Sequence, residues 1–248
     1  MARKAARKTR HSTTRPAAPS HDGSPRERII EAFMQLLAEQ PIERIGLAQI
    51  AEAADVSLAE LRGEFATPIA VLAAHVKALD RAVLAGAETD MDDESQRDRL
   101  FDVLMRRLDL MTPHRDAVRS LMRSARLNPP LALALNAMAV RSQQWMLAAA
   151  GIGANGPKGV VRAQGLALLF ANVVRAWVDD DDDNSRTMAA LDRELATGQR
   201  LAGLLDDLCR IPRAACNFRQ RMREAARRGG ERRGRRGRSE RGDEHLAM

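Results

Sequence analysis

The stretch that decides the fold runs from Leu47 to Phe65 and reads LAQIAEAADVSLAELRGEF. Its apolar residues follow helical spacing twice, with a break at residues 55–57 between the two runs. Ser57 and Glu60 have the spacing of a capping box, which predicts that the second helix begins after Ser57. Two short helices joined by a tight turn form a helix-turn-helix, whose second helix can lie in the major groove of DNA. The residues expected on the apolar faces or packed inward are Ile50, Ala51, Ala54, Val56, Leu58, Leu61 and Phe65.

Helix signals flank this stretch on both sides. Residues 24–27 (SPRE) form another capping box with proline at the first helical position, and their helix is expected to end near Gln40 and Pro41. Thr67 and Pro68 predict the cap and first turn of a longer helix. The apolar side of that longer helix is expected to carry Ile69, Leu72, Val76, Leu79 and Val83.

The segment from about Arg26 to Leu84 resembles the TetR family of bacterial repressors in the order of its helices, their spacing and their core positions. The resemblance implies an all-α, TetR-like fold, with an N-terminal helix-turn-helix domain and a C-terminal helical bundle for ligand binding and dimerisation. It also implies a DNA-binding transcriptional regulator that works as a ligand-responsive homodimer. The positions that match the family pattern are Ile50, Ala51, Ala54, Val56, Ser57, Leu61 and Phe65.

Several polar positions depart from the family pattern. The family usually has glycine at the position of Asp55 and threonine at that of Gly46. It usually has Thr-Leu-Tyr where this chain has residues 60–62 (ELR), and lysine where this chain has Pro68. In the family, that threonine, tyrosine and lysine typically hold DNA phosphates. Arg62 is a candidate here for a phosphate or guanine contact. The residues expected at the DNA interface are Gly46, Leu47, Ser57, Leu58, Ala59, Glu60, Arg62, Gly63 and Thr67.

The positive charge of the chain is concentrated at its two ends. The whole chain carries a formal net charge of +7. Between Arg26 and Asp80, however, nine acidic residues outnumber five basic ones. Both ends contain few apolar residues, so neither can bury enough surface to fold alone. Two interpretations remain open: the ends are solubilising tails, or they supply attraction for DNA phosphates. The basic residues of the N-terminal arm are Arg3, Lys4, Arg7, Lys8, Arg10 and Arg15.

The remaining sequence predicts a second helical domain. Alanine, leucine, valine and methionine dominate, with five phenylalanines, two tryptophans and no tyrosine, which favours helices over sheets. We expect four parts: a disordered basic arm over 1–24, the helix-turn-helix domain over 25–86, a ligand-binding and dimerisation domain over 94–211, and a disordered arginine-rich tail over 212–248.

The C-terminal helices are expected to supply both a dimer interface and a ligand pocket. The predicted helices 160–178 and 186–208 have more apolar surface than one antiparallel pair needs, which predicts a C2 dimer through them. Leu195 is a candidate for the residue that faces the partner. The expected effector is a small apolar molecule. The candidate pocket residues are Phe101, Leu104, Leu121, Met138, Trp145 and Phe170.

No catalytic, cofactor or metal site is predicted. Residues 151–156 spell GxGxxG, but the dinucleotide motif needs a preceding strand and a helix is expected there. The acidic run 179–183 is expected to be a solvated turn before the next helix. The chain has five scattered histidines, and Cys209 and Cys216 have no metal-binding spacing. With no signal peptide and no apolar run of membrane-spanning length, a non-enzymatic cytoplasmic protein is expected.

A second resemblance offers an alternative function. Residues 99–107 (RLFDVLMRR) and 187–193 (TMAALDR) are similar to the C-terminal domain of the TetR-fold accessory proteins of coenzyme Q biosynthesis. This likeness implies an isoprenoid- or lipid-binding accessory protein of ubiquinone biosynthesis that does not bind DNA. The apolar helices 131–150 and 160–178 would suit such a ligand, although ordinary core packing explains the same residues.

Overall fold

The computed structural model describes residues 23–86, 94–180 and 184–200. Within these ranges the regular elements are helices, and no strand occurs among them. The structure thus confirms the all-α prediction for the described part of the chain. The predicted N-terminal arm up to residue 22, the tail 212–248 and both cysteines lie outside it.

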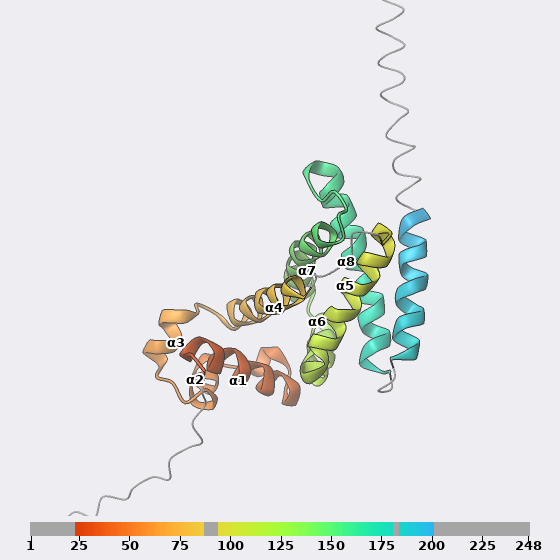
Figure 1. Ribbon diagram of the computed structural model, residues 1–248. Helices are drawn as coiled ribbons and strands as arrows, with labels where there is room; N and C mark the ends of the chain where they lie inside the picture. The colour runs from red at the N-terminus through yellow and green to blue at the C-terminus, as the bar shows by residue number, and fades with distance from the viewer. Residues whose placement is uncertain (1–22, 87–93, 181–183, 201–248) are drawn as a thin grey trace, which may run out of the picture. The chain divides into compact units, whose positions relative to one another are not determined.

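The first five elements occupy the N-terminal third of the chain (Figure 1). Their bounds are Pro25–Glu39 for α1, Ile42–Arg44 for the 3₁₀ helix η1, Leu47–Ala53 for α2, Leu58–Glu64 for α3 and Pro68–Ala85 for α4. The predicted capping box opens α1: Glu27 N donates to Ser24 Oγ at 3.3 Å, and Ser24 N donates to Glu27 Oε2 at 2.8 Å. The helix ends before Gln40, as the sequence predicts.

Longer helices follow after residue 94. Their bounds are Gln96–Met111 for α5, Thr112–His114 for the 3₁₀ helix η2, Arg115–Leu127 for α6, Pro129–Ala149 for α7 and Gly156–Val178 for α8. A further helix occupies residues 185–200, up to the end of the described range. α8 begins four residues before the predicted start at Val160, because Pro157 is accommodated in its first turn.

The chain divides into two compact units that are not contiguous in sequence. Unit 1 comprises the described residues up to Leu79 together with Met111–Leu135, and unit 2 comprises Asp80–Leu110 and the described residues from Asn136 onward. The predicted contiguous ranges 25–86 and 94–211 differ from this division because α6 packs against α1. Ser120 Oγ on α6 donates a hydrogen bond to the carbonyl of Gln40 at 3.2 Å.

The core of unit 1 holds α1, α2 and α3 together. Each of these three helices contacts the other two, and burial of their apolar side chains is the main force that stabilises so small an assembly. α2 and α3 have only seven residues each, too short to be stable alone in water, so packing against α1 maintains them. The side chains almost completely excluded from water include Ile29, Phe33, Leu37, Ile50 and Leu61.

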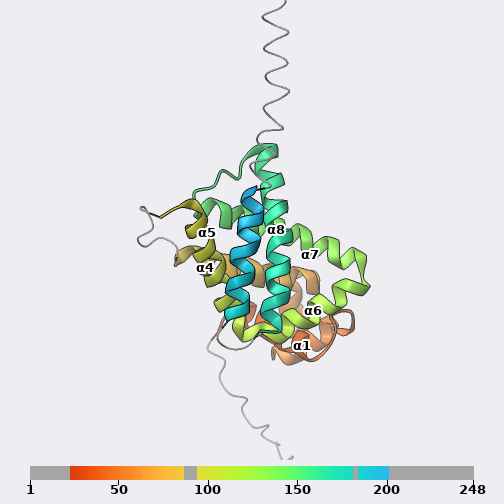
Figure 2. The same ribbon diagram turned by 90° about the vertical axis from the view of Figure 1, so that its right-hand side faces the viewer.

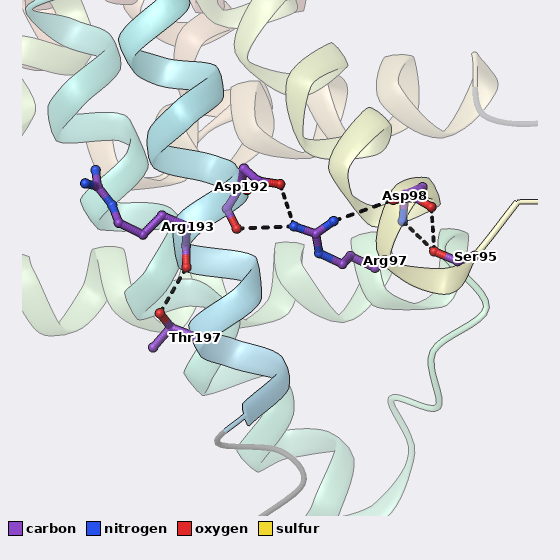
Figure 3. A network of polar contacts seen from close by, with 6 residues as sticks. All are labelled: Ser95, Arg97, Asp98, Asp192, Arg193 and Thr197. Carbon is purple, nitrogen blue, oxygen red and sulfur yellow. Dashed lines mark hydrogen bonds and ion pairs between the residues drawn. The ribbon is translucent and has the colours of Figure 1, made fainter.

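In unit 2, α8 and the helix 185–200 lie side by side (Figure 2). Their approach is close, since a Cβ on Gly198 would come within 2.8 Å of Leu169 Cδ1. The helix 185–200 is also joined to α5, where Arg97 Nη2 donates to Asp192 Oδ1 at 2.5 Å (Figure 3). The side chains almost completely buried in unit 2 include Leu104, Leu108, Met146, Trp177 and Leu191.

Candidate nucleic-acid interface

The turn between α2 and α3 depends on a left-handed backbone at Asp55. Its φ angle is +49°, a conformation that glycine adopts without cost and that aspartate tolerates better than most residues. This angle explains why the family pattern has glycine there. Val56 N, one residue on, donates to the carbonyl of Ala51 at 3.0 Å and closes the turn. Val56 itself is only half-buried.

Arg28 on α1 holds this turn in place. Its Nη1 donates to the carbonyl oxygens of Ala54 at 3.3 Å and Asp55 at 3.2 Å. These carbonyls follow the last turn of α2, where a cation is favourable because the helix dipole is negative. The contact therefore fixes the helix-turn-helix on α1 through the backbone as well as through apolar packing.

The predicted capping box at the start of α3 is confirmed. Glu60 N donates to Ser57 Oγ at 3.1 Å, and both Ser57 N and Ser57 Oγ donate to Glu60 Oε2 at 2.8 Å. The hydrogen bond from the backbone of Ser57, followed by that from its hydroxyl, lowers the pKa of the Glu60 carboxyl below its ordinary value. The Glu60 carboxylate is therefore directed at its own helix terminus.

The second carboxylate of α3 also has a partner. Glu64 Oε2 lies 3.0 Å from Arg26 Nη1, and the guanidinium of Arg26 sits 4.6 Å from the centre of the Phe65 ring. Both members of the ion pair are well exposed, so the pair adds little to stability. Its consequence is electrostatic: a cation from α1 offsets the charge of Glu64, which reduces repulsion of a phosphate near α3.

Five predicted interface residues lie exposed on α3: Leu58, Ala59, Glu60, Arg62 and Gly63. Arg62 makes no hydrogen bond or ion pair with any described residue. Leu58 was expected on the inward face with Leu61 and Phe65, and this expectation is wrong: Leu58 is 58% exposed. α3 ends at Glu64, and Phe65 has an extended backbone, so helical spacing cannot relate Phe65 to Leu58.

The remaining predicted interface residues begin helices. Gly46 is the N-cap of α2 without a side-chain capping bond, and Leu47 is its first residue. Thr67 Oγ1 accepts a hydrogen bond from Ala70 N at 3.1 Å at the start of α4, which confirms its predicted capping role. The arm residues Arg3, Lys4, Arg7, Lys8, Arg10 and Arg15 lie outside the described residues.

The six predicted pocket residues are not brought together around one described cavity. Leu121 belongs to unit 1, whereas the other five belong to unit 2. Leu104 and Phe170 are buried in the core, Phe101 and Met138 are half-buried, and Trp145 is 59% exposed. α7 is apolar on nearly every side, so its sequence gives little indication of which residues face inward.

Two features were not predicted from the sequence. Unit 1 contains a groove of about 700 Å³ lined by residues of α1, η1 and α6, among them Glu39, Glu43, Ser120 and Arg123. The second feature is a buried ion pair in unit 2.

That ion pair joins Arg107 Nη1 on α5 to Asp80 Oδ1 on α4. Ser142 Oγ on α7 donates to the same carboxylate oxygen at 2.7 Å, and the guanidinium of Arg107 lies 5.9 Å from the centre of the Phe170 ring. The sequence does contain a signal for the burial of Arg107. This residue lies four positions after Val103 and three after Leu104, and therefore on the same buried face of α5.

The predicted dimer helices differ in their outward faces. On α8, Val161 and Leu168 are more than half exposed, so the described residues leave part of an apolar face of this helix uncovered. Leu195 on the helix 185–200 is only 5% exposed, and the expectation that it faces a partner is wrong. Its side chain packs inside its own protomer because the helix 185–200 turns this face toward its neighbours in unit 2. Residues 201–208 lie outside the described ranges.

The structure also places the two sequence motifs that resemble ligand sites. The GxGxxG segment follows α7, with left-handed φ angles at Gly151 and Gly156, and no strand precedes it. Asp180 is buried rather than solvated, because its Oδ2 accepts hydrogen bonds from Thr187 N and Oγ1 at 2.7 and 2.6 Å. The described residues include no cluster of three metal-ligating side chains.

No family model and no curated protein matches the chain. Solved structures do. A TetR transcriptional regulator from Nitrosomonas europaea is 23% identical, with 71% of this chain and 99% of that one covered at a TM-score of 0.57. A TetR regulator from Rhodococcus sp. RHA1 is 20% identical over 70% and 95%, with a TM-score of 0.51. A TetR-family regulator from Syntrophomonas wolfei is 12% identical over 72% and 94%, with a TM-score of 0.53.

The chain has the TetR fold. In this fold the α2–α3 pair is the helix-turn-helix that the sequence predicts, and the capped, exposed α3 is its second helix. None of the described helices has the length and hydropathy of a membrane-spanning segment.

Proposed function

We propose that this protein is a non-enzymatic, TetR-type transcriptional regulator that binds operator DNA as a ligand-responsive homodimer in the cytoplasm. The observation that carries the proposal is the exposed face of α3. Both carboxylates of α3 have partners, whereas Arg62 is exposed and makes no hydrogen bond or ion pair with the described residues. The Glu64 charge is offset by Arg26 and the Glu60 carboxylate is directed at its own helix terminus, so Arg62 is the charged side chain of α3 that is available to a base edge or a phosphate.

The basic N-terminal arm would add the phosphate attraction that the acidic helix-turn-helix segment lacks. Deletion of residues 2–20 removes six basic side chains from each subunit. DNA affinity should then fall and depend less on salt, because fewer counterions are released on binding. An unchanged salt slope would mean that the arm takes no part in binding.

Dimerisation is expected through the exposed apolar face of α8 that includes Val161 and Leu168. The effector is expected to be a small, largely apolar molecule that binds in unit 2. Its binding would favour one spacing between the helix-turn-helix domains of the two subunits. Leu168→Glu should shift the protein from dimer to monomer in light scattering while leaving helicity intact. Leu133→Glu changes an exposed leucine outside α8 and is the matched control.

The direct test is selection from a random pool of DNA duplexes at physiological salt. A regulator should enrich one sequence and bind it about a thousandfold more tightly than random DNA. Arg62→Ala should abolish this preference, whereas Arg126→Ala removes an exposed arginine from α6 and should preserve it. No enriched duplex, together with an isoprenoid that copurifies and is identified by mass spectrometry, would instead support the lipid-binding alternative.

A further inference from the structure

The first turn of α3 presents apolar rather than hydrogen-bonding side chains. Leu58 and Ala59 are the first two residues of α3, and both are exposed. In helix-turn-helix proteins the N-terminal residues of the second helix reach the base edges. If the proposed function holds, these two apolar side chains therefore occupy positions that can contact bases.

The polar side chains of α3 each have a partner within the described chain, with one exception. Ser57 and Glu60 bond each other, and Glu64 pairs with Arg26. A carboxylate could otherwise accept a hydrogen bond from the amino group of cytosine. Arg62 is the exception on this helix, and its guanidinium geometry matches the O6 and N7 acceptors of guanine. Among the polar side chains of α3, Arg62 is thus the one without a partner in the described chain, and it can recognise one guanine in each half-site.

Apolar contact offers a second means of discrimination. In the major groove thymine is distinguished by its C5 methyl group, which is the natural partner of an exposed aliphatic side chain. Gly63 lies four residues after Ala59, on the same side of α3, and a Cβ placed on it would meet no atom within 4 Å. No contact within the described chain therefore requires glycine there, and its small size leaves room for DNA to approach.

We propose that α3 selects a half-site in which a guanine read by Arg62 stands near thymines whose methyl groups contact Leu58 and Ala59. This inference rests on the proposed function, because it specifies the bases that the same helix face would read. Leu58, which the sequence predicts both on the apolar face and at the DNA interface, would then be a residue that determines specificity.

The test replaces thymine with deoxyuridine, which pairs identically but lacks the C5 methyl group. On the duplex enriched by selection, binding of the full-length protein is measured by fluorescence anisotropy while thymines near the guanine are replaced one at a time. Loss of one buried methyl contact should weaken binding about fourfold. Leu58→Ser should remove the sensitivity to deoxyuridine, whereas Leu127→Ser, at an exposed leucine of α6, should retain it.

The outcomes separate this inference from the proposed function. A duplex bound specifically and equally well with thymine or deoxyuridine overturns the thymine inference and leaves DNA binding intact. A deoxyuridine effect that persists in Leu58→Ser overturns the role of Leu58. Failure to enrich any duplex overturns the proposed function itself.

Discussion

Arg62 on α3 and Arg107 on α5 bring the same charge into opposite surroundings. Arg62 is exposed and makes no ion pair with the described residues, whereas Arg107 is buried and paired with Asp80. An exposed cation keeps its hydration and remains available to a partner. A buried cation must be neutralised by its own chain because desolvation is costly. The exposed Arg62 supports the binding role proposed for the helix-turn-helix of unit 1, whereas the buried Arg107–Asp80 pair stabilises the polar centre of unit 2.

The largest expected effect follows from breaking the buried pair. Arg107→Ala leaves the Asp80 carboxylate buried without its cation, so the free energy of unfolding should fall by about 3–5 kcal/mol. Urea unfolding followed by circular dichroism measures this change. Arg62→Ala is the matched control at an exposed arginine and should change stability by less than ~0.5 kcal/mol. Equal effects of the two variants would remove the distinction between the two regions.

A smaller effect is expected from the cap of α3. Ser57→Ala removes the hydroxyl that accepts from Glu60 N, so stability should fall by about 1 kcal/mol. Ser57→Thr keeps a capping hydroxyl and should retain most of the stability. Thermal unfolding provides the measurement. If the alanine variant were as stable as the threonine variant, the capping box would contribute nothing to the position of α3.

The smallest effect concerns pH. The pKa of Glu60 in the folded protein is lowered from the ordinary value of 4.5, because the backbone and hydroxyl of Ser57 donate hydrogen bonds to its carboxylate. A lowered pKa contributes stability that is present above pH 4.5 and is lost as the pH falls through the folded-state pKa. The free energy of unfolding should therefore fall less steeply with decreasing pH in Glu60→Gln than in the wild type. Equal slopes would contradict the lowered pKa.

The caps and the helix order could be predicted from sequence because their signals are local. Ser24, Ser57 and Thr67 each lie within three residues of the groups that they bond, and the spacing of apolar residues was long enough to indicate most helices. The turn residue Asp55 was also recognised as the place where the family has glycine, and its positive φ supplies the reason.

Side-chain direction and long-range pairing could not be predicted in the same way. Leu58 is exposed although Leu61, three residues further along α3, is buried, and Leu195 is buried in unit 2 among helices distant in sequence. Asp80 and Arg107 are separated by 27 positions, and no local pattern pairs them. Of the candidate site, the identity of the α3 residues was therefore predictable, whereas the engagement of Glu60 and Glu64 and the availability of Arg62 required the structure.

Gly63→Ala shows whether the exposed face of α3 contacts DNA. Alanine at a helical position with open space around it should raise the free energy of unfolding by about 0.5–1 kcal/mol, because glycine loses more backbone entropy on folding. The added methyl group should nevertheless obstruct the approach of DNA and weaken binding to the selected duplex about tenfold, equivalent to ~1.4 kcal/mol. The expected result is a more stable protein that binds DNA less well. A more stable protein with unchanged or improved DNA affinity would contradict it.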